Sequence, residues 1–353
     1  MSLSTPPQTA LVTGATGYLA SWIVKYLLEA GWTVHATVRS LAQMEKTAHL
    51  TAMAAQAPNR LHLFEADLLA PNSYTQAMAG CQVVIHTASP FITGKVRDPQ
   101  AQLIDPAVKG VRNVLDAATA TPGVQRVVLT SSVVAIYTDA SDLAGTEKGV
   151  FDESHWNTTA SLSYQPYSYS KTLAEKTAWE MAQTQNRWNL VVINPGFILG
   201  PSLTRRNDSV SIDFMIKMGD GTYLAGMPNL ELAVVDVRDA AHAHIAAASQ
   251  PAASGRHILA REATSMLSAA RLLRAHFGKQ YPFPTRKTPK WLAWLVGPLF
   301  GLSRRYVSRH IGKSLHIDNR YGIKDLGIEY RPLEETLVQH FQQLLDDGLV
   351  RRR

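Results

Sequence analysis

The segment SYQPYSYSKTLAEK holds a tyrosine and a lysine at a spacing that suits proton transfer to a carbonyl oxygen. Tyr167 and Lys171 are four residues apart, so on a helix they share one face. A nearby positive charge lowers the pKa of a phenol towards physiological pH, as a proton donor requires. Tyr164 and Tyr169 are poorer candidates, because neither has a lysine four positions later. The pair predicts a catalytic centre, and a chance helical pair is the alternative.

Two adjacent serines follow the apolar run RVVLT, at the end of a predicted strand. Ser132 is expected to hydrogen-bond the oxygen of a substrate. Ser131 competes with it, because a one-residue error in the strand end exchanges which hydroxyl faces the crevice. A cap at the strand end is the alternative role for either serine.

The segment TGATGYLA (13–20) follows one predicted strand and opens a predicted helix. Gly14 and Gly17 let the backbone approach a pyrophosphate, whose charge meets free N–H groups and the positive end of the helix dipole. Ala20 stands where a small residue allows close packing of helix on sheet. This context predicts a dinucleotide site, and an ordinary tight turn is the alternative. The predicted cofactor-binding residues of this segment are Thr13, Gly14, Thr16, Gly17, Tyr18 and Leu19.

The second predicted strand ends in ATVRS, which places Arg39 where a site for NAD commonly has Asp or Glu. A guanidinium can pair with the 2′-phosphate of NADP(H), and Lys46 could add a second cation. We therefore predict NADP(H) as the cofactor, with solvent-facing cations as the alternative. After the third predicted strand, Asp67 and Leu68 could flank the adenine, although Asp67 could equally cap a turn.

The segment HTASP (86–90) follows the fourth predicted strand and offers small groups beside the same cofactor. Thr87, Ala88 and Ser89 are predicted cofactor contacts. His86 is expected to be structural.

Apolar runs that alternate with helical patterns must place these residues. Leu19, Ile23 and Leu27 recur at fourfold spacing, which predicts a helix over 18–30 that packs on a sheet. The runs are almost continuously hydrophobic, as in strands covered on both faces, and they predict an α/β fold with a doubly wound parallel sheet of the Rossmann type. The predicted strands span 9–14, 32–38, 61–67, 81–88, 124–132 and 190–196, with further helical patterns near 100–120 and 165–187.

The chain has 353 residues, enough for a principal domain and a smaller lobe. The regular alternation is lost in two later regions that carry more Pro, Gly and Trp. We predict an NADP(H)-binding domain from residues 1–196 plus 233–263, and a mixed substrate-binding lobe from 197–232 plus 264–353. Residues 232–248 are interpreted as a strand end and a helix that return to the main sheet.

The predicted lobe contains aromatic candidates for the wall of a substrate pocket, with core packing as an equal alternative. Its apolar stretch 291–302 is too short to span a membrane and is interrupted by Gly297 and Pro298. We expect a core segment or pocket wall there, with a membrane-facing or partner-facing patch as the alternative. The aromatic candidates are Phe91, Phe197, Tyr223 and Trp294.

Composition narrows the class of protein. With 46% hydrophobic and 18% charged residues, the chain is expected to be globular. The net charge of +7 suits an anionic cofactor, a nucleic acid or an anionic membrane, but no aromatic track interleaves the scattered basic residues, so a nucleic-acid partner is not expected. The first residues suggest no secretory signal or anchor, which predicts a cytoplasmic protein without stable membrane insertion. No metal site is expected.

The motifs TGATGYLA, ATVRS, RVVLTSS, YSYSK, INPGFILGP and VDVRDAAHAHI, in this order, resemble the extended short-chain dehydrogenase/reductase superfamily. The resemblance covers nearly the whole chain and is strongest to the dihydroflavonol-reductase-like and methylglyoxal-reductase-like carbonyl reductases. It implies that Ser132, Tyr167 and Lys171 form a catalytic triad and that Pro195 and Ile198 line the nicotinamide pocket.

The resemblance also implies a reaction, the NADPH-dependent transfer of hydride to a ketone or aldehyde. Tyr167 would donate the proton and Ser132 would polarise the oxygen, while Lys171 would bind ribose and lower the pKa of the tyrosine. The substrate would be a small molecule, and the protein a monomer or homodimer.

Two enzyme alternatives keep this fold, namely a sugar-nucleotide epimerase or dehydratase and a hydroxysteroid dehydrogenase. Arg39 argues against an epimerase that retains NAD, whereas the apolar lobe keeps the steroid alternative open. A non-enzymatic alternative is a regulator that senses NADP(H), against which the presence of Ser132, Tyr167 and Lys171 argues.

Overall fold

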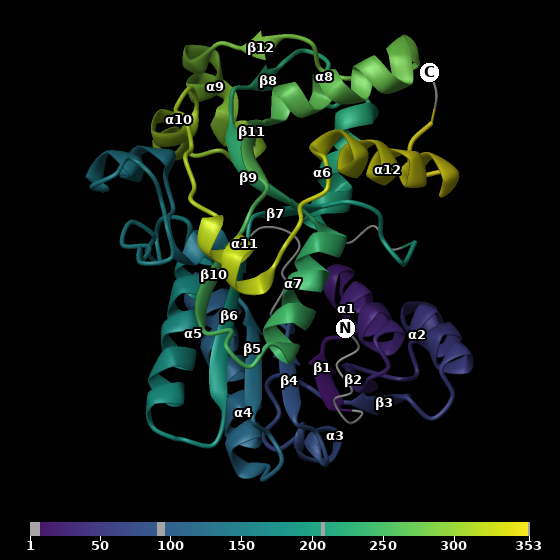
Figure 1. Cartoon of the computed structure of the whole chain (residues 1–353). Coiled ribbons are helices and arrows are strands. Elements are labelled where there is room, and N and C mark those ends of the chain that lie inside the picture. Colours follow the sequence, from purple (N-terminus) through teal and green to yellow (C-terminus); the bar gives the residue numbers. More distant parts are fainter. Residues whose placement is uncertain (1–7, 90–95, 206–208, 352–353) are drawn as a thin grey trace.

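A parallel sheet of seven strands forms the centre of the computed structural model, which describes residues 8–89, 96–205 and 209–351 (Figure 1). The strand order is β10-β6-β5-β4-β1-β2-β3, and every neighbouring pair is parallel. The prediction of a doubly wound parallel sheet is confirmed. The strands are β1 (Thr9–Thr13), β2 (Thr33–Val38), β3 (Leu61–Glu65), β4 (Val83–His86), β5 (Arg126–Thr130), β6 (Asn189–Pro195) and β10 (Gly255–Leu259).

Helices cover both faces of the sheet, which explains why its strands are almost continuously apolar. In β1, Ala10 and Val12 pack into the core under α1 and α7, whereas Leu11 between them packs into the opposite core under α4 and α5. The helices around the sheet are α1 (Tyr18–Glu29), α2 (Met44–Gln56), α3 (Thr75–Met78), α4 (Asp105–Ala120), α5 (Pro166–Gln183) and α7 (Val237–Ser249), and a π-helical turn (Gln100–Ile104) precedes α4.

The chain reverses its direction of progress across the sheet at β1. Strand β2 lies on one side of β1 and β4 on the other. Such a switch point leaves a crevice at the carboxyl ends of the strands. The turn before α1 and the segments after β4 and β5 all lie at this edge.

A smaller lobe lies beyond the carboxyl edge of the sheet (Figure 1). Its three-stranded sheet has the order β11-β9-β7, with β11 antiparallel and β7 parallel to β9, and a pair of short strands, β8 and β12, lies beside it. The lobe strands are β7 (Phe197–Leu199), β8 (Met227–Pro228), β9 (Glu231–Asp236), β11 (Glu262–Ser265) and β12 (Lys287–Thr288). The later helices are α6 (Val210–Gly219), α8 (Met266–Phe277), α9 (Lys290–Val296), α10 (Arg304–His310), α11 (Arg320–Leu326) and α12 (Leu333–Asp346). Short 3₁₀ helices are η2 (Val133–Ala135), η3 (Ala140–Gly145), η4 (Gly278–Gln280) and η5 (Gly297–Phe300).

Two strands differ from the prediction. Strand β10, the seventh of the main sheet, was not predicted. Residues 232–248 do return to the main sheet through α7, which packs against α1, but the strand at their start is β9 and pairs within the lobe instead. The apolar run alone does not state which sheet a strand joins.

The apolar stretch 291–302 is the clearest correction. The expectation of a core segment or pocket wall was wrong for most of it, because Trp291, Trp294, Leu295, Leu299 and Phe300 are exposed. In the described ranges, no helix combines the length and apolar character that crossing a membrane requires.

Candidate active site

The glycine-rich turn brings the start of α1 to the crevice. Gly14 has φ +64°, and a Cβ there would lie 3.2 Å from the Cα of Ala88, so this position requires glycine. The N–H of Gly17 donates to the carbonyl of Gly14 at 2.9 Å, and α1 starts at the next residue. Gly17 has no side chain with which to cap the helix. The turn therefore offers a close backbone approach and a helix N-terminus to a phosphate.

Thr13 ties the turn to the segment after β4. Its hydroxyl lies 2.8 Å from Nδ1 of His86 and accepts hydrogen bonds from the N–H groups of Thr87 (3.1 Å) and Ala88 (3.0 Å). Burial lowers the pKa of His86 to about 3, so its ring is neutral. The structural role expected for His86 fits this geometry. Thr13 is placed to act through the backbone it holds.

The first residues of α1 also hold the lobe. The hydroxyl of Tyr18 donates to the carbonyl of Gly200, and one turn later Nε1 of Trp22 donates to the carbonyl of Pro201 at 2.8 Å. Leu19 is buried in the core. The side chains of Tyr18 and Leu19 are thus engaged elsewhere, which leaves only their backbone for the predicted cofactor contact. Thr16, between the two glycines, is half-buried.

The predicted contacts of the adenosine part lie at the ends of β2 and β3. Arg39 and Lys46 are both exposed, Arg39 directly after β2 and Lys46 in the first turn of α2. The carboxylate of Asp67 accepts a hydrogen bond from the N–H of Leu69 at 2.8 Å, which is the turn-capping role left open by the sequence. Leu68 packs on Gly110, where a Cβ would lie 2.6 Å from Cγ of Leu68.

The two serines after β5 have different surroundings. Ser131 is buried, and its hydroxyl donates to the carboxylate of Glu175. The hydroxyl of Ser132 makes only long contacts, donating to the carbonyl of Pro195 at 3.4 Å and accepting from the N–H of Val134 at 3.3 Å. Ser131 is therefore engaged by Glu175, although it lines the same small pocket as Lys171, whereas Ser132 is half-buried and its hydroxyl is only weakly engaged.

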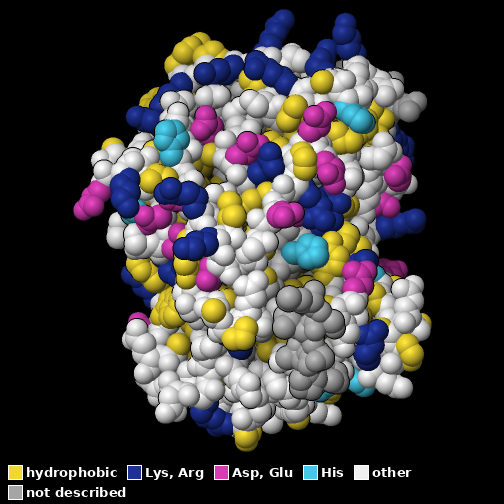
Figure 2. Space-filling view, in the orientation of Figure 1, with side chains coloured by type: hydrophobic (Ala, Val, Ile, Leu, Met, Phe, Trp, Pro, Cys, Tyr) yellow, Lys and Arg dark blue, Asp and Glu magenta, His cyan; other side chains and the backbone are white. Residues whose placement is uncertain are grey.

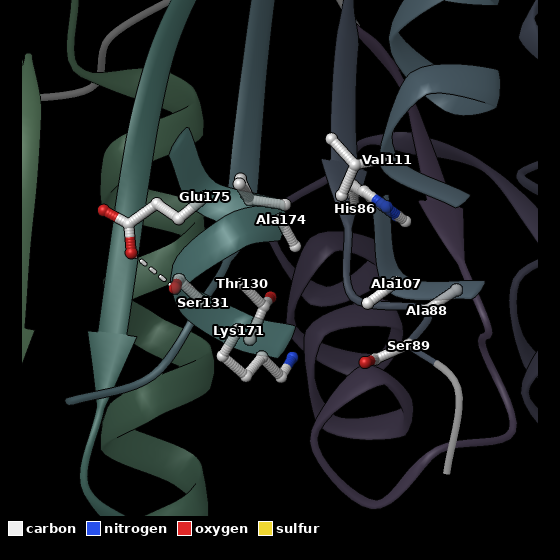
Figure 3. Close-up of a pocket in the computed structure, with 11 residues that line it drawn as sticks. His86, Ala88, Ser89, Ala107, Val111, Thr130, Ser131, Lys171, Ala174 and Glu175 are labelled. Atoms are coloured by element: carbon white, nitrogen blue, oxygen red, sulfur yellow. Dashed lines mark hydrogen bonds between the residues drawn. The ribbon is translucent and has the colours of Figure 1, made fainter. Parts of the chain in front are cut away.

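Glu175 is the centre of a buried network beneath this edge. Its carboxylate accepts the hydrogen bond from Ser131 (Figure 3) and further hydrogen bonds from Asn194 and Arg256, so it joins the ends of β5 and β6 to β10. The amide of Asn194 donates in turn to the carbonyl of Ser132 at 3.1 Å. The network thus fixes the backbone on which the candidate catalytic serine stands. Sequence reasoning missed these residues, although Glu175 follows Lys171 at the same four-residue spacing that linked Lys171 to Tyr167.

Arg256 extends the network to the loop after η3. It donates to the carbonyls of Glu153 and His155, and its guanidinium lies 3.8 Å from the ring centre of Trp156. Both charges of the Glu175–Arg256 pair are buried. A buried pair of this kind positions its surroundings, and removal of one partner leaves an uncompensated charge.

Tyr167 and Lys171 lie one turn apart on α5, as predicted. Lys171 lines a pocket together with His86, Ala88 and Ser89, and Figure 3 shows its side chain extending across that pocket. Burial lowers the pKa of Lys171 to about 8, against a smaller raising effect of the Glu175 charge. Its ammonium therefore titrates close to physiological pH.

The pKa of Tyr167 differs in direction from the prediction. Desolvation of the phenol raises its pKa above the ordinary value, even though the residue as a whole is 46% exposed. Burial alone accounts for this shift, and the lowering expected from Lys171 is not found. A phenol with a raised pKa carries its proton at neutral pH, which is the form that a proton donor needs.

The residues predicted beside the nicotinamide and substrate lie where β6 leads into the lobe. Pro195 ends β6 next to Ser132, and Ile198 is half-buried in β7. Phe197 packs edge-on against Phe214 at 5.4 Å, and Phe214 lies 6.3 Å from Tyr223, so the two candidates belong to one aromatic row.

Two other aromatic candidates do not join this row. Phe91 lies outside the described residues. Trp294 is exposed on α9 with the guanidinium of Arg304 over its ring, and its place in a pocket wall stays a prediction.

Comparison with known proteins identifies the family of the chain. Residues 10–260 match the NAD dependent epimerase/dehydratase family. A cinnamoyl-CoA reductase of Medicago truncatula is 36% identical over 350 residues, 98% of each chain. An anthocyanidin reductase of Vitis vinifera is 36% identical over 289 residues, 79% of this chain and 83% of the relative. The crystal structure of Gre2 from Candida albicans in complex with NADPH superposes with a TM-score of 0.77 at 27% identity, covering 97% of this chain and 99% of that one. The predicted resemblance is confirmed: the chain is an oxidoreductase that belongs to the NAD dependent epimerase/dehydratase family, within the extended short-chain dehydrogenases/reductases.

Proposed function

We propose that this protein is an NADPH-dependent reductase of a ketone or aldehyde carbonyl, with Ser132, Tyr167 and Lys171 as its catalytic residues. The observation that carries the proposal is the difference in hydrogen bonding between the two serines. Ser131 is bound by Glu175 in the interior, which leaves the hydroxyl of Ser132 at the edge where the helix of Tyr167 and Lys171 packs against η2. A hydroxyl, a phenol and an ammonium at one crevice suit reduction of a carbonyl.

NADPH fits the residues at the crevice. The positive φ of Gly14 and its contact with Ala88 leave no room for a side chain, so a pyrophosphate would meet bare backbone there. Arg39 follows β2, where a carboxylate would favour NAD, and its exposed guanidinium can pair with a 2′-phosphate. Lys171 would hold the nicotinamide ribose, and Pro195 and Ile198 would pack beside the ring. The cofactor supplies the hydride.

The chain's own residues then handle the oxygen of the substrate. Ser132 donates a hydrogen bond to the carbonyl oxygen and polarises it. As the carbonyl carbon accepts hydride, Tyr167 gives its proton to the oxygen, and the alcohol forms. The charge of Lys171 stabilises the tyrosinate that this transfer creates, so the neighbouring cation matters most at that moment.

The substrate is proposed to carry an apolar or aromatic group. The row formed by Phe197, Phe214 and Tyr223 is half-buried beside the end of β6 and offers ring faces to such a group. The similar proteins named above are reductases of cinnamoyl-CoA and of anthocyanidins, both of which carry aromatic rings. An aryl-substituted carbonyl compound is therefore the first class to test.

We also keep three predictions as proposals. The NADP(H)-binding domain comprises 1–196 plus 233–263 and the substrate lobe 197–232 plus 264–353. The protein acts in the cytoplasm. It is a monomer or a homodimer.

The test is the loss of NADPH absorbance with a panel of aryl ketones, 1,2-diketones, aldehydes, flavonoid ketones and a cinnamoyl thioester, repeated with NADH. We expect turnover that is faster with NADPH and that falls by about three orders of magnitude in Tyr167→Phe, while NADPH binding changes little. Tyr169→Phe, on the same helix, is the matched control and should keep its activity. NADPH binding without turnover of any panel member, or an active Tyr167→Phe variant, would overturn the proposal.

A further inference from the structure

The outer face of α9 and η5 exposes large apolar side chains that no other described part of the chain covers. Trp291 is 68% exposed, Leu299 84% and Phe300 77%, and Leu295 and Trp294 are exposed beside them. Such values mean that the side chains project from the surface. Contiguous exposed apolar groups of this size mark a surface for a partner or a membrane.

The inner face of the same segment is well packed. Ala293 forms a small buried cluster with Val307 and Ile311 of α10, and Leu302 packs against it. The segment is thus a folded helical hairpin with one apolar face inward and a second apolar face outward. The outward face is a feature of a stable element.

The hairpin is mounted rigidly on the body of the protein. Arg309 and His310 of α10 both bind the buried carboxylate of Asp139, which also accepts a hydrogen bond from the hydroxyl of Tyr164 at 2.7 Å. Arg305 stacks on the ring of Tyr164 at 3.9 Å. The exposed tip therefore has a fixed orientation relative to the rest of the chain.

Positive charge surrounds this face. Residues 263–317 contain ten Lys and Arg and no Asp or Glu. The formal charge of this segment is therefore larger than the net charge of +7 of the whole chain. Figure 2 shows Lys and Arg side chains gathered with hydrophobic ones at the end of the molecule that carries α8, α9 and β12. The five basic residues nearest in sequence to the exposed stretch 291–302 are Arg286, Lys287, Lys290, Arg304 and Arg305. Within the described ranges, none of them forms an ion pair with a carboxylate.

We propose that the hairpin of α9, η5 and α10 binds the surface of an anionic lipid bilayer. Trp, Leu and Phe enter the boundary between headgroups and acyl chains, where Trp is favoured, and the basic rim meets the lipid phosphates and carboxylates. A bilayer suits this face better than a folded protein does, because its apolar groups project from a convex tip, whereas protein partners anchor side chains in complementary pockets. The absence of acidic residues over the whole segment is charge complementarity to an anionic surface.

The test is sedimentation of the full chain with vesicles. We expect the protein to bind vesicles of phosphatidylcholine with phosphatidylserine at low salt and to be released from them by high salt. Its affinity for vesicles of phosphatidylcholine alone should be lower by about tenfold or more. The double variant Leu299→Gln/Phe300→Gln should bind the anionic vesicles about tenfold or more weakly, because both side chains lose their insertion. The matched control is Val210→Gln/Ile323→Gln, which replaces exposed apolar residues elsewhere and should bind like the original chain.

Reductase turnover and sedimentation velocity complete the test. The Leu299/Phe300 variant should keep its turnover and secondary structure, since both residues lie outside the proposed active site. Equal binding to neutral and anionic vesicles, unchanged binding by the variant, or no vesicle binding together with a dimer that this variant dissociates would each overturn the proposal. The last outcome would identify the face as an interface between two copies of the chain.

Discussion

The central sheet and the C-terminal part of the lobe differ in the polar contacts that add to their apolar packing. Neighbouring strands of the sheet and the helices on them meet through two apolar cores. The C-terminal segments also enter an apolar core, for example through Leu337 and Phe341, but carboxylates that are buried or half-buried bind them to earlier parts of the chain as well. These contacts are Asp139 with Arg309 and His310, Asp236 with Thr336, Asp239 with Arg331, and His257 with Asp325.

Buried charge therefore distinguishes parts of the molecule that respond differently to conditions. Apolar packing is insensitive to pH and salt, whereas each buried charge depends on its partner remaining ionised. The strands that end at Thr13 and His86 should keep their positions over a wide range of conditions. The attachment of the C-terminal segments, and the sheet edge that Glu175 and Arg256 hold, should respond to acid or to single charge removals.

The largest expected effect belongs to the sheet edge and compares its two serines. Ser132→Ala should lower kcat for carbonyl reduction by about two to three orders of magnitude with little change in stability, because its hydroxyl serves the substrate oxygen. Ser131→Ala should instead lower the free energy of unfolding by about 1–3 kcal/mol, because Glu175 loses a buried hydrogen bond. Paired kinetics and denaturant melts check both, and the reverse pattern would show that Ser131 is the catalytic serine.

The next largest effect is expected at Asp139, which binds α10 to the rest of the chain. Asp139→Asn should lower the free energy of unfolding by about 3 kcal/mol, because the buried carboxylate binds Arg309, His310 and Tyr164 together and all three lose its charge. Arg309 keeps its second partner, Asp142. Asp318→Asn is the matched control, since its partner Arg320 is mostly exposed, and it should cost less than about 1 kcal/mol. Thermal melts of both variants measure the contrast, and equal losses would remove the distinction between buried and surface attachments.

The pKa of Asp139 determines how its contribution to stability changes with pH. Burial raises the pKa of Asp139, but hydrogen bonds from His310, Tyr164 and Arg309 lower it by more, and its net pKa lies below the ordinary value. Such a group stabilises the fold above its unfolded pKa and loses that contribution as pH falls through its folded pKa. The difference in Tm between the original chain and Asp139→Asn should therefore narrow below about pH 4, and a constant difference would contradict this assignment.

The next prediction concerns Lys171, at the carboxyl edge of the central sheet. The pKa of Lys171 is about 8 and its charged form is the useful one, so kcat/KM for NADPH should be flat below pH 8. Above it, kcat/KM should fall by about tenfold per pH unit, because the ammonium is lost. Lys171→Arg should move this decline to higher pH. A pH profile that does not differ between the two proteins would show that another group causes it.

The smallest expected effect concerns the rim of the cofactor site. Arg39→Ala should raise the KM for NADPH by about tenfold and leave the KM for NADH nearly unchanged, because an exposed guanidinium contributes only through the 2′-phosphate. Lys46→Ala provides the comparison and should have a smaller effect. Equal losses for both cofactors would mean that Arg39 acts on the fold or on the adenine.

The sheet half could be predicted closely because it repeats one pattern. The first strand, helix and second strand were placed at 9–14, 18–30 and 32–38, and they occupy Thr9–Thr13, Tyr18–Glu29 and Thr33–Val38. Continuous apolar runs between turns are typical of strands that helices cover on both faces, so few other folds fit the pattern. The family resemblance, the NADP(H)-type turn and the pair on α5 followed from the same regular elements.

The remaining features depend on partners distant in the sequence. Strand β10 contains Arg256 and His257, which are buried only because Glu175 and Asp325 meet them. The choice between the two serines likewise depends on Glu175, which no local pattern connects to them. Apolar composition also does not state which way a helix faces, so the outward side of 291–302 could not be recognised from its hydrophobicity.

The hydroxyl of Tyr18 gives the molecule a thermodynamic connection between its two ligands. This residue begins α1, where a pyrophosphate would lie, and it holds the carbonyl of Gly200 at the base of the lobe. Any tightening of that contact on nucleotide binding also orders the lobe that receives the substrate. Coupling of this kind is reciprocal, so a substrate that orders the lobe must strengthen nucleotide binding by the same factor. The affinity for NADPH is then partly a property of the substrate, although the two ligands never meet at this phenol.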